Sequence, residues 1–204
     1  MIEAHISAIF PTPIYKAKLD RKFTEQELRF VEDMKTKSVQ NIGNKHSANK
    51  YVLNDPSFAT LKKEIDLFLE DYFSKILLTP QTISPFITQS WINYTEINEY
   101  HHVHSHPNSY LSGVLYINAD KAQDTITFSH NRYDQIKLAF TASNAFNSEN
   151  WSYPVGSGDI VVFPSRLNHL VVAKKGNNTR VSLSFNVFVK GNLGPTGALT
   201  ELKI

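Results

Sequence analysis

Histidines cluster between positions 101 and 106 of this 204-residue chain, in the segment HHVHSH. His104 and His106 are two positions apart, so on a β-strand their side chains point to the same face and can present two nitrogens to one metal ion. His102 and His104 form an equally valid pair by spacing alone. Because an isolated H-x-H pair is more often part of a polar turn than of a metal site, the rest of the chain must decide.

A third histidine and an arginine follow far downstream. His169 comes just after the apolar stretch DIVVFPS, and Arg180 follows beyond the turn-forming segment KKGNN. Three protein ligands on one face of a metal leave positions free for a co-substrate and dioxygen, which is the arrangement of non-haem Fe(II) oxygenases. The spacing therefore suggests a catalytic iron site formed by His104, His106 and His169.

Arg180 is expected to face this metal site. If the turn centres on Gly176 and Asn177, a hairpin pairs Arg180 with Ala173, whose side chain shares a face with His169. A buried arginine requires an anion, and a carboxylate matches the planar guanidinium with two hydrogen bonds. The alternative is an arginine that pairs with a structural Asp or Glu.

Composition narrows the range of functions. Lys and Arg number 21 against 19 Asp and Glu, without a block of basic residues, so neither nucleic acid nor a membrane surface is indicated as a partner. The absence of cysteine excludes disulfides, thiolate nucleophiles and cysteine-ligated zinc. The first residues, MIEAHISAIFPTPIY, have neither a basic start nor an uninterrupted apolar run, and no stretch is apolar for long enough to span a bilayer. We therefore expect a soluble, cytoplasmic protein.

Two helices are predicted in the first part of the chain. Thr24 and Glu27 form a capping-box pattern that predicts a helix running to about Ser38, and the polar segment NIGNKHSANKY after it is expected to be a loop. Asp55 and Pro56 then predict an N-cap and a first helical position. The second helix is expected to lie against a broad apolar surface and to end before Pro80, because apolar residues recur at three- and four-residue spacing at Phe58, Leu61, Ile65, Phe68, Leu69, Tyr72, Phe73 and Ile76.

Strands are predicted from Phe86 onwards, in the segments FITQSWINYTEI, YLSGVLYIN, DTITFSH, DIVVFPS, HLVVAKK and TRVSLSFNVFVKG. We expect a mainly β fold with N-terminal helices, a double-stranded β-helix (jelly roll, cupin-like) with two helices packed on one sheet. A single domain over residues 1–204 is expected, with an N-terminal strand and helices at 1–85, the β-helix core at 86–190 and a tail at 191–204. Residues 129–154 lack a clean period, and we expect a substrate-facing loop there.

The last predicted strand has one polar and one apolar face. Its polar residues are Arg180, Ser182, Ser184 and Asn186, and they alternate with Val181, Leu183, Phe185 and Val187. We expect the apolar row to pack under the two helices and the polar row to face the interior of the roll. A polar interior would be the functional site.

The set H-x-H, SGVLYIN, FPS-x-x-x-H and R-x-S, spread over about residues 91–189, resembles the 2-oxoglutarate- and Fe(II)-dependent oxygenases of the prolyl-hydroxylase-like branch. Within that branch it is most similar to the small oxygenases of microbes and their viruses. The resemblance implies that His104, His106 and His169 bind Fe(II) and that Arg180 binds the distal carboxylate of 2-oxoglutarate. It also assigns three residues to the co-substrate pocket, namely Ser182, Tyr116 and Tyr94.

The reaction implied by this resemblance is a hydroxylation that consumes dioxygen and 2-oxoglutarate and releases succinate and CO₂. The substrate is left open: it could be a peptidyl side chain such as proline, or a small molecule. A homodimer is one option for the assembly.

His106 stands where most of this family has Asp or Glu. A neutral imidazole is still a good ligand, and the anionic 2-oxoglutarate would restore the charge balance. Glu99 is an alternative candidate for a carboxylate ligand. Two other interpretations are a cupin-type metal protein and a structural jelly roll such as a virus-particle domain. The cupin pattern resembles H-x-H followed closely by Glu, but this chain has Asn108, Ser109 and Tyr110 there instead. A purely structural jelly roll would not need three histidines and a buried arginine.

Overall fold

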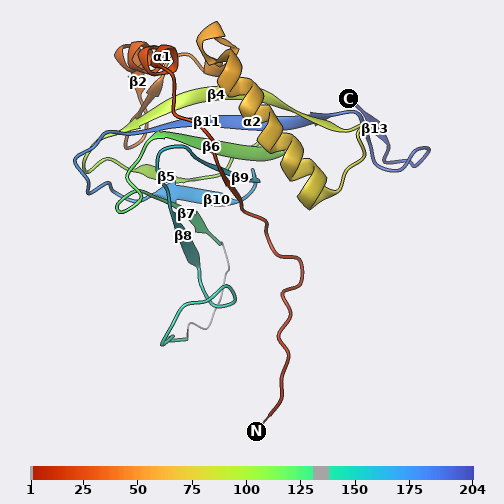
Figure 1. The fold of residues 1–204 in the computed structure, drawn as a ribbon. Coiled ribbons are helices and arrows are strands. Elements are labelled where there is room, and N and C mark those ends of the chain that lie inside the picture. Colours follow the sequence, from red (N-terminus) through yellow and green to blue (C-terminus); the bar gives the residue numbers. More distant parts are fainter. Residues whose placement is uncertain (1, 131–137) are drawn as a thin grey trace.

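The computed structural model describes residues 2–130 and 138–204, which form two layered β-sheets with helices on the outside (Figure 1). The main sheet has seven strands, in the order β1 (Tyr15–Lys18), β9 (Asp159–Pro164), β6 (Leu111–Asn118), β11 (Arg180–Lys190), β4 (Ser84–Thr95), β3 (Lys45–Ser47) and β2 (Ser38–Gln40). The second sheet has four, in the order β5 (His101–His104), β10 (Asn168–Val171), β7 (Thr125–Ser129) and β8 (Asn150–Pro154). A short pair, β12 (Asn192–Leu193) and β13 (Leu202–Lys203), lies in the tail.

The first helix, α1 (Glu25–Thr36), begins at the predicted capping box. The backbone N–H of Glu27 donates to the hydroxyl of Thr24, and the N–H of Thr24 donates to the carboxylate of Glu27. Arg21 also binds this carboxylate at 2.6 Å and reaches Glu64 in the second helix at 2.7 Å. One cap residue therefore starts α1 and, through Arg21, ties it to its neighbour.

The second helix, α2 (Ala59–Tyr72), follows a 3-10 turn at Pro56–Phe58, in which the Asp55 carboxylate accepts from the N–H of Ser57 at 2.9 Å. A π-helical turn, Phe73–Leu77, extends it. Leu78 then adopts a left-handed conformation and ends the helical segment before Pro80. Both predicted helices are thus confirmed.

Apolar side chains pack on both faces of the main sheet. Between the sheet and the helices lie buried residues that include Leu61, Ile65, Leu69, Ile92, Leu115, Leu183 and Phe185. Between the two sheets lie Val114, Tyr116, Ile126, Phe128, Val161 and Phe163. Figure 1 shows α2 lying across the strands β4, β11 and β6. The predicted mainly β architecture with helices over one sheet, and the packing of the apolar row of β11 beneath them, are confirmed.

The predicted hairpin between His169 and Arg180 is wrong. β10 belongs to the four-stranded sheet, whereas β11 pairs with β4 and β6 in the main sheet, so Arg180 lies opposite Thr95 and not opposite Ala173. The segment between them crosses from one sheet to the other. Turn-forming residues mark a change of direction, but they do not show which strand the chain joins next.

Two predicted loops contain strands. The polar segment after α1 forms β3 and pairs with β2, which extends the main sheet. The expected substrate loop at 129–154 contains β8 at its end, paired with β7. Its residues 131–137 lie outside the described part, and its described residues line neither the cavity nor the groove discussed below.

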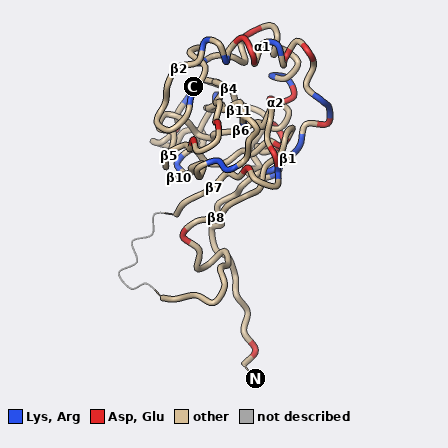
Figure 2. The backbone as a smooth tube through the Cα atoms, turned by 90° about the vertical axis from the view of Figure 1, so that its left-hand side faces the viewer, with Lys and Arg blue, Asp and Glu red and all other residues tan. Residues whose placement is uncertain are grey.

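Basic and acidic residues are interspersed along the backbone of α1 and α2 (Figure 2). Pairs one helical turn apart, such as Arg29 with Glu25 and Lys62 with Asp66, balance each other there. Within the described residues, no helix has both the length and the apolar character needed to cross a membrane.

Gly113 of β6 provides a test of the packing between sheet and helices. It lies opposite Phe185 of β11, and a Cβ at this position would come within 2.1 Å of the Phe185 ring. We expect Gly113→Ala to lower the free energy of unfolding by about 1–3 kcal/mol, because the ring must leave its packed position. Chemical denaturation measures this, with Gly156→Ala as the control, since its Cβ would meet its nearest neighbour at an ordinary 3.4 Å. Equal stabilities of the two variants would contradict the packing.

Candidate metal and anion site

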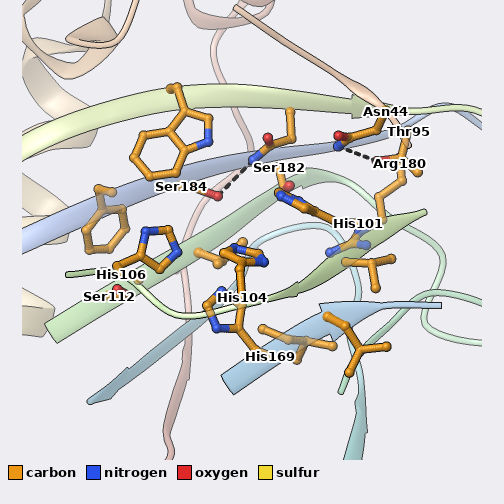
Figure 3. A pocket seen from close by; sticks show the side chains of 18 of the residues that line it. Asn44, Thr95, His101, His104, His106, Ser112, His169, Arg180, Ser182 and Ser184 are labelled. Atoms are coloured by element: carbon orange, nitrogen blue, oxygen red, sulfur yellow. Dashed lines mark hydrogen bonds between the residues drawn. The ribbon is translucent and has the colours of Figure 1, made fainter. Parts of the chain in front are cut away.

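Three of the predicted histidines converge between the two sheets. β5 and β10 are antiparallel neighbours in which His104 lies directly opposite His169. His106 follows the end of β5, and its ligand nitrogen lies with those of the other two within 4.8 Å of one another. Ring centroids are 4.2 Å apart for His104 and His169, 5.0 Å for His104 and His106, and 5.2 Å for His106 and His169. We call this group the inner triad; it is labelled in Figure 3.

Backbone carbonyls orient two of the three rings. The Nδ1 of His104 lies 2.8 Å from the carbonyl oxygen of His102, and the Nδ1 of His169 lies 3.1 Å from that of Leu167. A carbonyl can only accept, so each Nδ1 carries the hydrogen and each Nε2 keeps a lone pair. This is the tautomer and orientation that a metal ligand needs.

Ser165 holds the backbone of His106, the third member of the inner triad. The N–H of His106 donates to the carbonyl oxygen of Ser165 at 3.0 Å, and the buried Ser165 hydroxyl donates to Ser109 and contacts Ser112. The sequence motif FPS contains this serine, but the motif alone does not indicate its role. The carbonyl of Ser165 therefore fixes the backbone at His106, just after β5.

Burial keeps these imidazoles neutral. Removal from water lowers the pKa of His106 from 6.5 to about 4 and that of His169 to about 2, with His104 adding to both effects through charge repulsion. The pKa of His104 is also lowered by burial, against the opposing hydrogen bond to His102. Neutral imidazoles are the form that binds transition metals.

Arg180 lies in the same cavity, buried and without a charged partner in the part of the chain that the structure describes. It is 3% exposed, and its Nε and Nη1 have no hydrogen-bond partner among the described residues. Its guanidinium lies 5.2 Å from the ring of Tyr116, whose buried hydroxyl is close enough to interact with Arg180 but makes no hydrogen bond of normal geometry with any described residue. Burial raises the pKa of Tyr116, so this hydroxyl stays protonated. Both residues therefore keep unused hydrogen-bonding capacity, and the interpretation of Arg180 as half of a structural ion pair is not supported.

Ser182 follows Arg180 on the same face of β11 and lines the cavity, as predicted. Tyr94 does not. It is buried under α1, where its hydroxyl donates to the carbonyl oxygen of Val31 at 2.7 Å. Its assignment to the co-substrate pocket is therefore corrected, because alternation along β4 turns its side chain towards the helices.

Glu99 is not a metal ligand in this arrangement. Its carboxylate accepts from the backbone N–H of Glu96 at 2.8 Å and closes the turn between β4 and β5. The cavity lining contains neither Asp nor Glu among the described residues. The inner triad is thus made of imidazoles alone.

Several lining residues were not predicted. His101 stacks on His104 with ring centroids 4.4 Å apart, because a bulge in β5 turns side chains three positions apart to the same side. Asn93 donates to Ser184 at 2.9 Å and keeps an unpaired buried oxygen. The alternation W-I-N-Y-T in β4 could have predicted that Trp91, Asn93 and Thr95 share the face that lines the cavity.

The site has an enclosed part and an open part. The enclosed cavity, between the inner triad and Arg180, holds about 30 Å³. It adjoins an open groove of about 360 Å³, and Trp91, His101, His104 and His106 line both. Trp91 stands beside His106 with ring centroids 5.7 Å apart. A ligand reaching the triad from the groove therefore passes Trp91.

Replacing Arg180 tests its burial without a partner. We expect Arg180→Met to raise the free energy of unfolding by about 1–3 kcal/mol, because an unsatisfied buried donor set is removed while the apolar stem is kept. Thermal and chemical denaturation measure this, with exposed Arg166→Met as the control. Destabilisation by Arg180→Met alone would show that the guanidinium has a structural partner.

The buried histidines predict a pH dependence of stability. Their pKa values lie below 6.5 in the folded chain, at about 4 for His106, so the unfolded chain binds more protons between these values. Stability is therefore complete above pH 6.5 and falls as the pH is lowered from 6.5 towards 4. Thermal denaturation in the presence of a chelator measures this, and His169→Gln should reduce the dependence. Stability that rises on acidification through this range would contradict the burial of neutral rings.

Comparison with known proteins relates this geometry to a family. Residues 89–186 match the family described as "Putative 2OG-Fe(II) oxygenase". No curated protein sequence matches the chain.

Solved structures share its fold. HygX from Streptomyces hygroscopicus, crystallised with nickel, 2-oxoglutarate and hygromycin B, has a TM-score of 0.59 at 12% identity, over 91% of this chain and 84% of its own. The 2-oxoglutarate-dependent epimerase SnoN from nogalamycin biosynthesis has a TM-score of 0.58 at 14% identity, over 92% and 83%. A Pseudomonas putida prolyl-4-hydroxylase has a TM-score of 0.53 at 12% identity, over 86% and 92%. Residues 89–186, which include the inner triad and Arg180, are thus similar to the 2OG-Fe(II) oxygenases in sequence, and the fold around them is similar to that of solved members.

Proposed function

We propose that the inner triad binds Fe(II) and that Arg180 binds 2-oxoglutarate, so that the chain hydroxylates a substrate with release of succinate and CO₂. One observation carries this assignment. Three convergent imidazoles and a buried arginine with unpaired donors line a single cavity. Burying the three imidazoles, and burying the guanidinium of Arg180, costs free energy unless each group binds a ligand.

The donor chemistry of the inner triad fits Fe(II). Imidazole nitrogens bind divalent iron, and three ligands on one side leave positions for the co-substrate and dioxygen. When bound, the iron and 2-oxoglutarate together supply the oxidising chemistry of the reaction. The protein's part is to keep the ligands neutral, which burial accomplishes, and to orient them, which the carbonyl bonds of His104 and His169 accomplish.

Arg180 fits the distal carboxylate of 2-oxoglutarate. A carboxylate would satisfy its unpaired Nε and Nη1 with two charge-assisted hydrogen bonds. Ser182, next along the same face of β11, and the unpaired hydroxyl of Tyr116 are the neighbouring donors. In a cavity without carboxylates this anion also offsets the positive charge of the metal and the arginine.

His101 has a special place in this arrangement. Its ring lies against His104 on the side of Arg180 (Figure 3), and it lines the cavity that 2-oxoglutarate would enter. A co-substrate bound between the inner triad and Arg180 would therefore lie next to the His101 side chain. Its own polar contact is weak, a 3.4 Å approach of Asn41 Nδ2 to its Nε2, so little holds it in place.

The open groove is the proposed substrate entrance. Trp91 and Pro107 give it apolar surface, and Gln89 and Asn186 give it hydrogen-bonding groups. This lining suits either a peptidyl side chain, such as proline, or a small molecule. The proposal also includes a single domain over the whole chain and a cytoplasmic location. It leaves open whether two copies form a homodimer.

Anaerobic addition of Fe(II) and 2-oxoglutarate tests the proposed site. We expect a weak visible charge-transfer band with the wild type and its loss in His169→Ala. Arg180→Met should raise the 2-oxoglutarate concentration for half-formation of the band by at least about tenfold, with little change in the iron requirement. Arg166→Met is the matched control. No band with the wild type, an undiminished band in His169→Ala, or equal effects of Arg180→Met on both ligands would overturn the assignment.

A further inference from the structure

The histidine cluster contains a second group with metal-binding geometry. His101, His102 and His104 also bring one ligand nitrogen each to within 4.8 Å of one another. We call this group the outer triad. It shares His104 with the inner triad, and the proposed function does not use its other two members as ligands.

The two triads have nearly the same dimensions. Ring centroids in the outer triad are 4.4 Å apart for His101 and His104, 5.1 Å for His102 and His104, and 5.2 Å for His101 and His102. The inner triad spans 4.2 to 5.2 Å. In both triads the ligand nitrogens lie close enough together to share one ion.

The nitrogens of the outer triad are free to bind. The Nδ1 of His102 is buried and has no hydrogen-bond partner. The Nε2 of His101 lies 3.4 Å from the amide nitrogen of Asn41. Because an amide nitrogen donates, this Nε2 carries a lone pair. His104 uses its Nδ1 on a carbonyl and offers a single nitrogen, so the triads cannot both hold an ion with three ligands.

The two triads differ in their access to solvent. His102 lines the open groove and not the enclosed cavity, whereas His169 lines the cavity and not the groove. His104 lines both. His101 and His106 also line both, so all three members of the outer triad face the groove, whereas the inner triad has one member, His169, that faces the cavity alone.

We propose that the outer triad is a second, groove-facing binding position for a divalent transition metal, from which the ion passes to the inner triad. During the transfer His104 stays bound, while His106 and His169 replace His101 and His102. Imidazole-only ligation suits such an exchange, because no charged ligand has to be separated from the ion. The inference rests on the proposed function only in taking the inner triad as the catalytic position.

Equilibrium dialysis with Co(II) alone, without 2-oxoglutarate, tests the second position. His106→Ala and His169→Ala each break the inner triad and leave the outer one complete. We expect both variants to bind Co(II) with an affinity within about tenfold of the wild type. Adding His102→Ala to either variant should weaken this affinity by a further factor of about ten or more. His46→Ala in the same backgrounds is the matched control, because His46 lines the groove but belongs to neither triad.

A rate measurement tests the transfer. Stopped-flow absorption should show Co(II) uptake about tenfold slower in His102→Ala than in the wild type, with the final affinity little changed, because the inner triad is intact. The second position is refuted if the inner-triad variants bind Co(II) no better than their His102 double variants. An unchanged uptake rate in His102→Ala refutes the transfer.

These results are independent of the charge-transfer experiment. A wild type that forms no band with Fe(II) and 2-oxoglutarate would refute the proposed function, yet Co(II) retention by His106→Ala would still establish the outer position. Circular dichroism of each variant checks the fold, and two different inner-triad variants are used because His169 is buried and His106 is only partly so.

Discussion

The alternation of side chains along β11 is the constraint on which the rest of the structure depends. One face of this central strand packs against the helices through Leu183 and Phe185, and the other presents Arg180 and Ser182 to the space between the sheets. A slip of one residue in its register would bury the guanidinium under α2 and expose the apolar row. Because β11 is paired on both sides over most of its length, by β4 and β6, such a slip is strongly opposed.

The metal side of the site depends on a different sheet. His104 and His169 face each other across one pair of strands, and His106 is held by the backbone of Ser165. Ligand and anion positions therefore come from two sheets whose spacing is set by the apolar contacts between them, such as those of Phe163. The aromatic packing of Phe163 against His169, with ring centroids 4.7 Å apart, joins that core directly to a member of the inner triad.

Much of this could be predicted from the sequence, because the relevant signals are local. The period-two pattern of β11 shows its two faces, and the capping box shows the start of α1. The family resemblance assigned roles to the distant His169 and Arg180, which now line one cavity, although their roles as ligands remain predictions. The resemblance placed Tyr94 in the co-substrate pocket, but the alternation of side chains along β4 turns it towards the helices.

Other features have no local signal. The hairpin predicted between β10 and β11 failed because a turn does not specify which sheet the next strand enters. His101 was missed because a single extra residue in β5 changes which side chains share a face. Both depend on pairing between segments that are distant in the sequence, and the sequence pattern of one segment does not contain that information.

The carbonyl bonds to the Nδ1 atoms of His104 and His169 have one more consequence. Each connects a ring to the backbone two residues earlier in its own segment, so the rotamers of two proposed ligands are restricted by the folded chain itself. An incoming ion would then not have to immobilise these side chains, and less of its binding energy would be spent on conformational entropy. Two of the three proposed ligands are therefore preorganised.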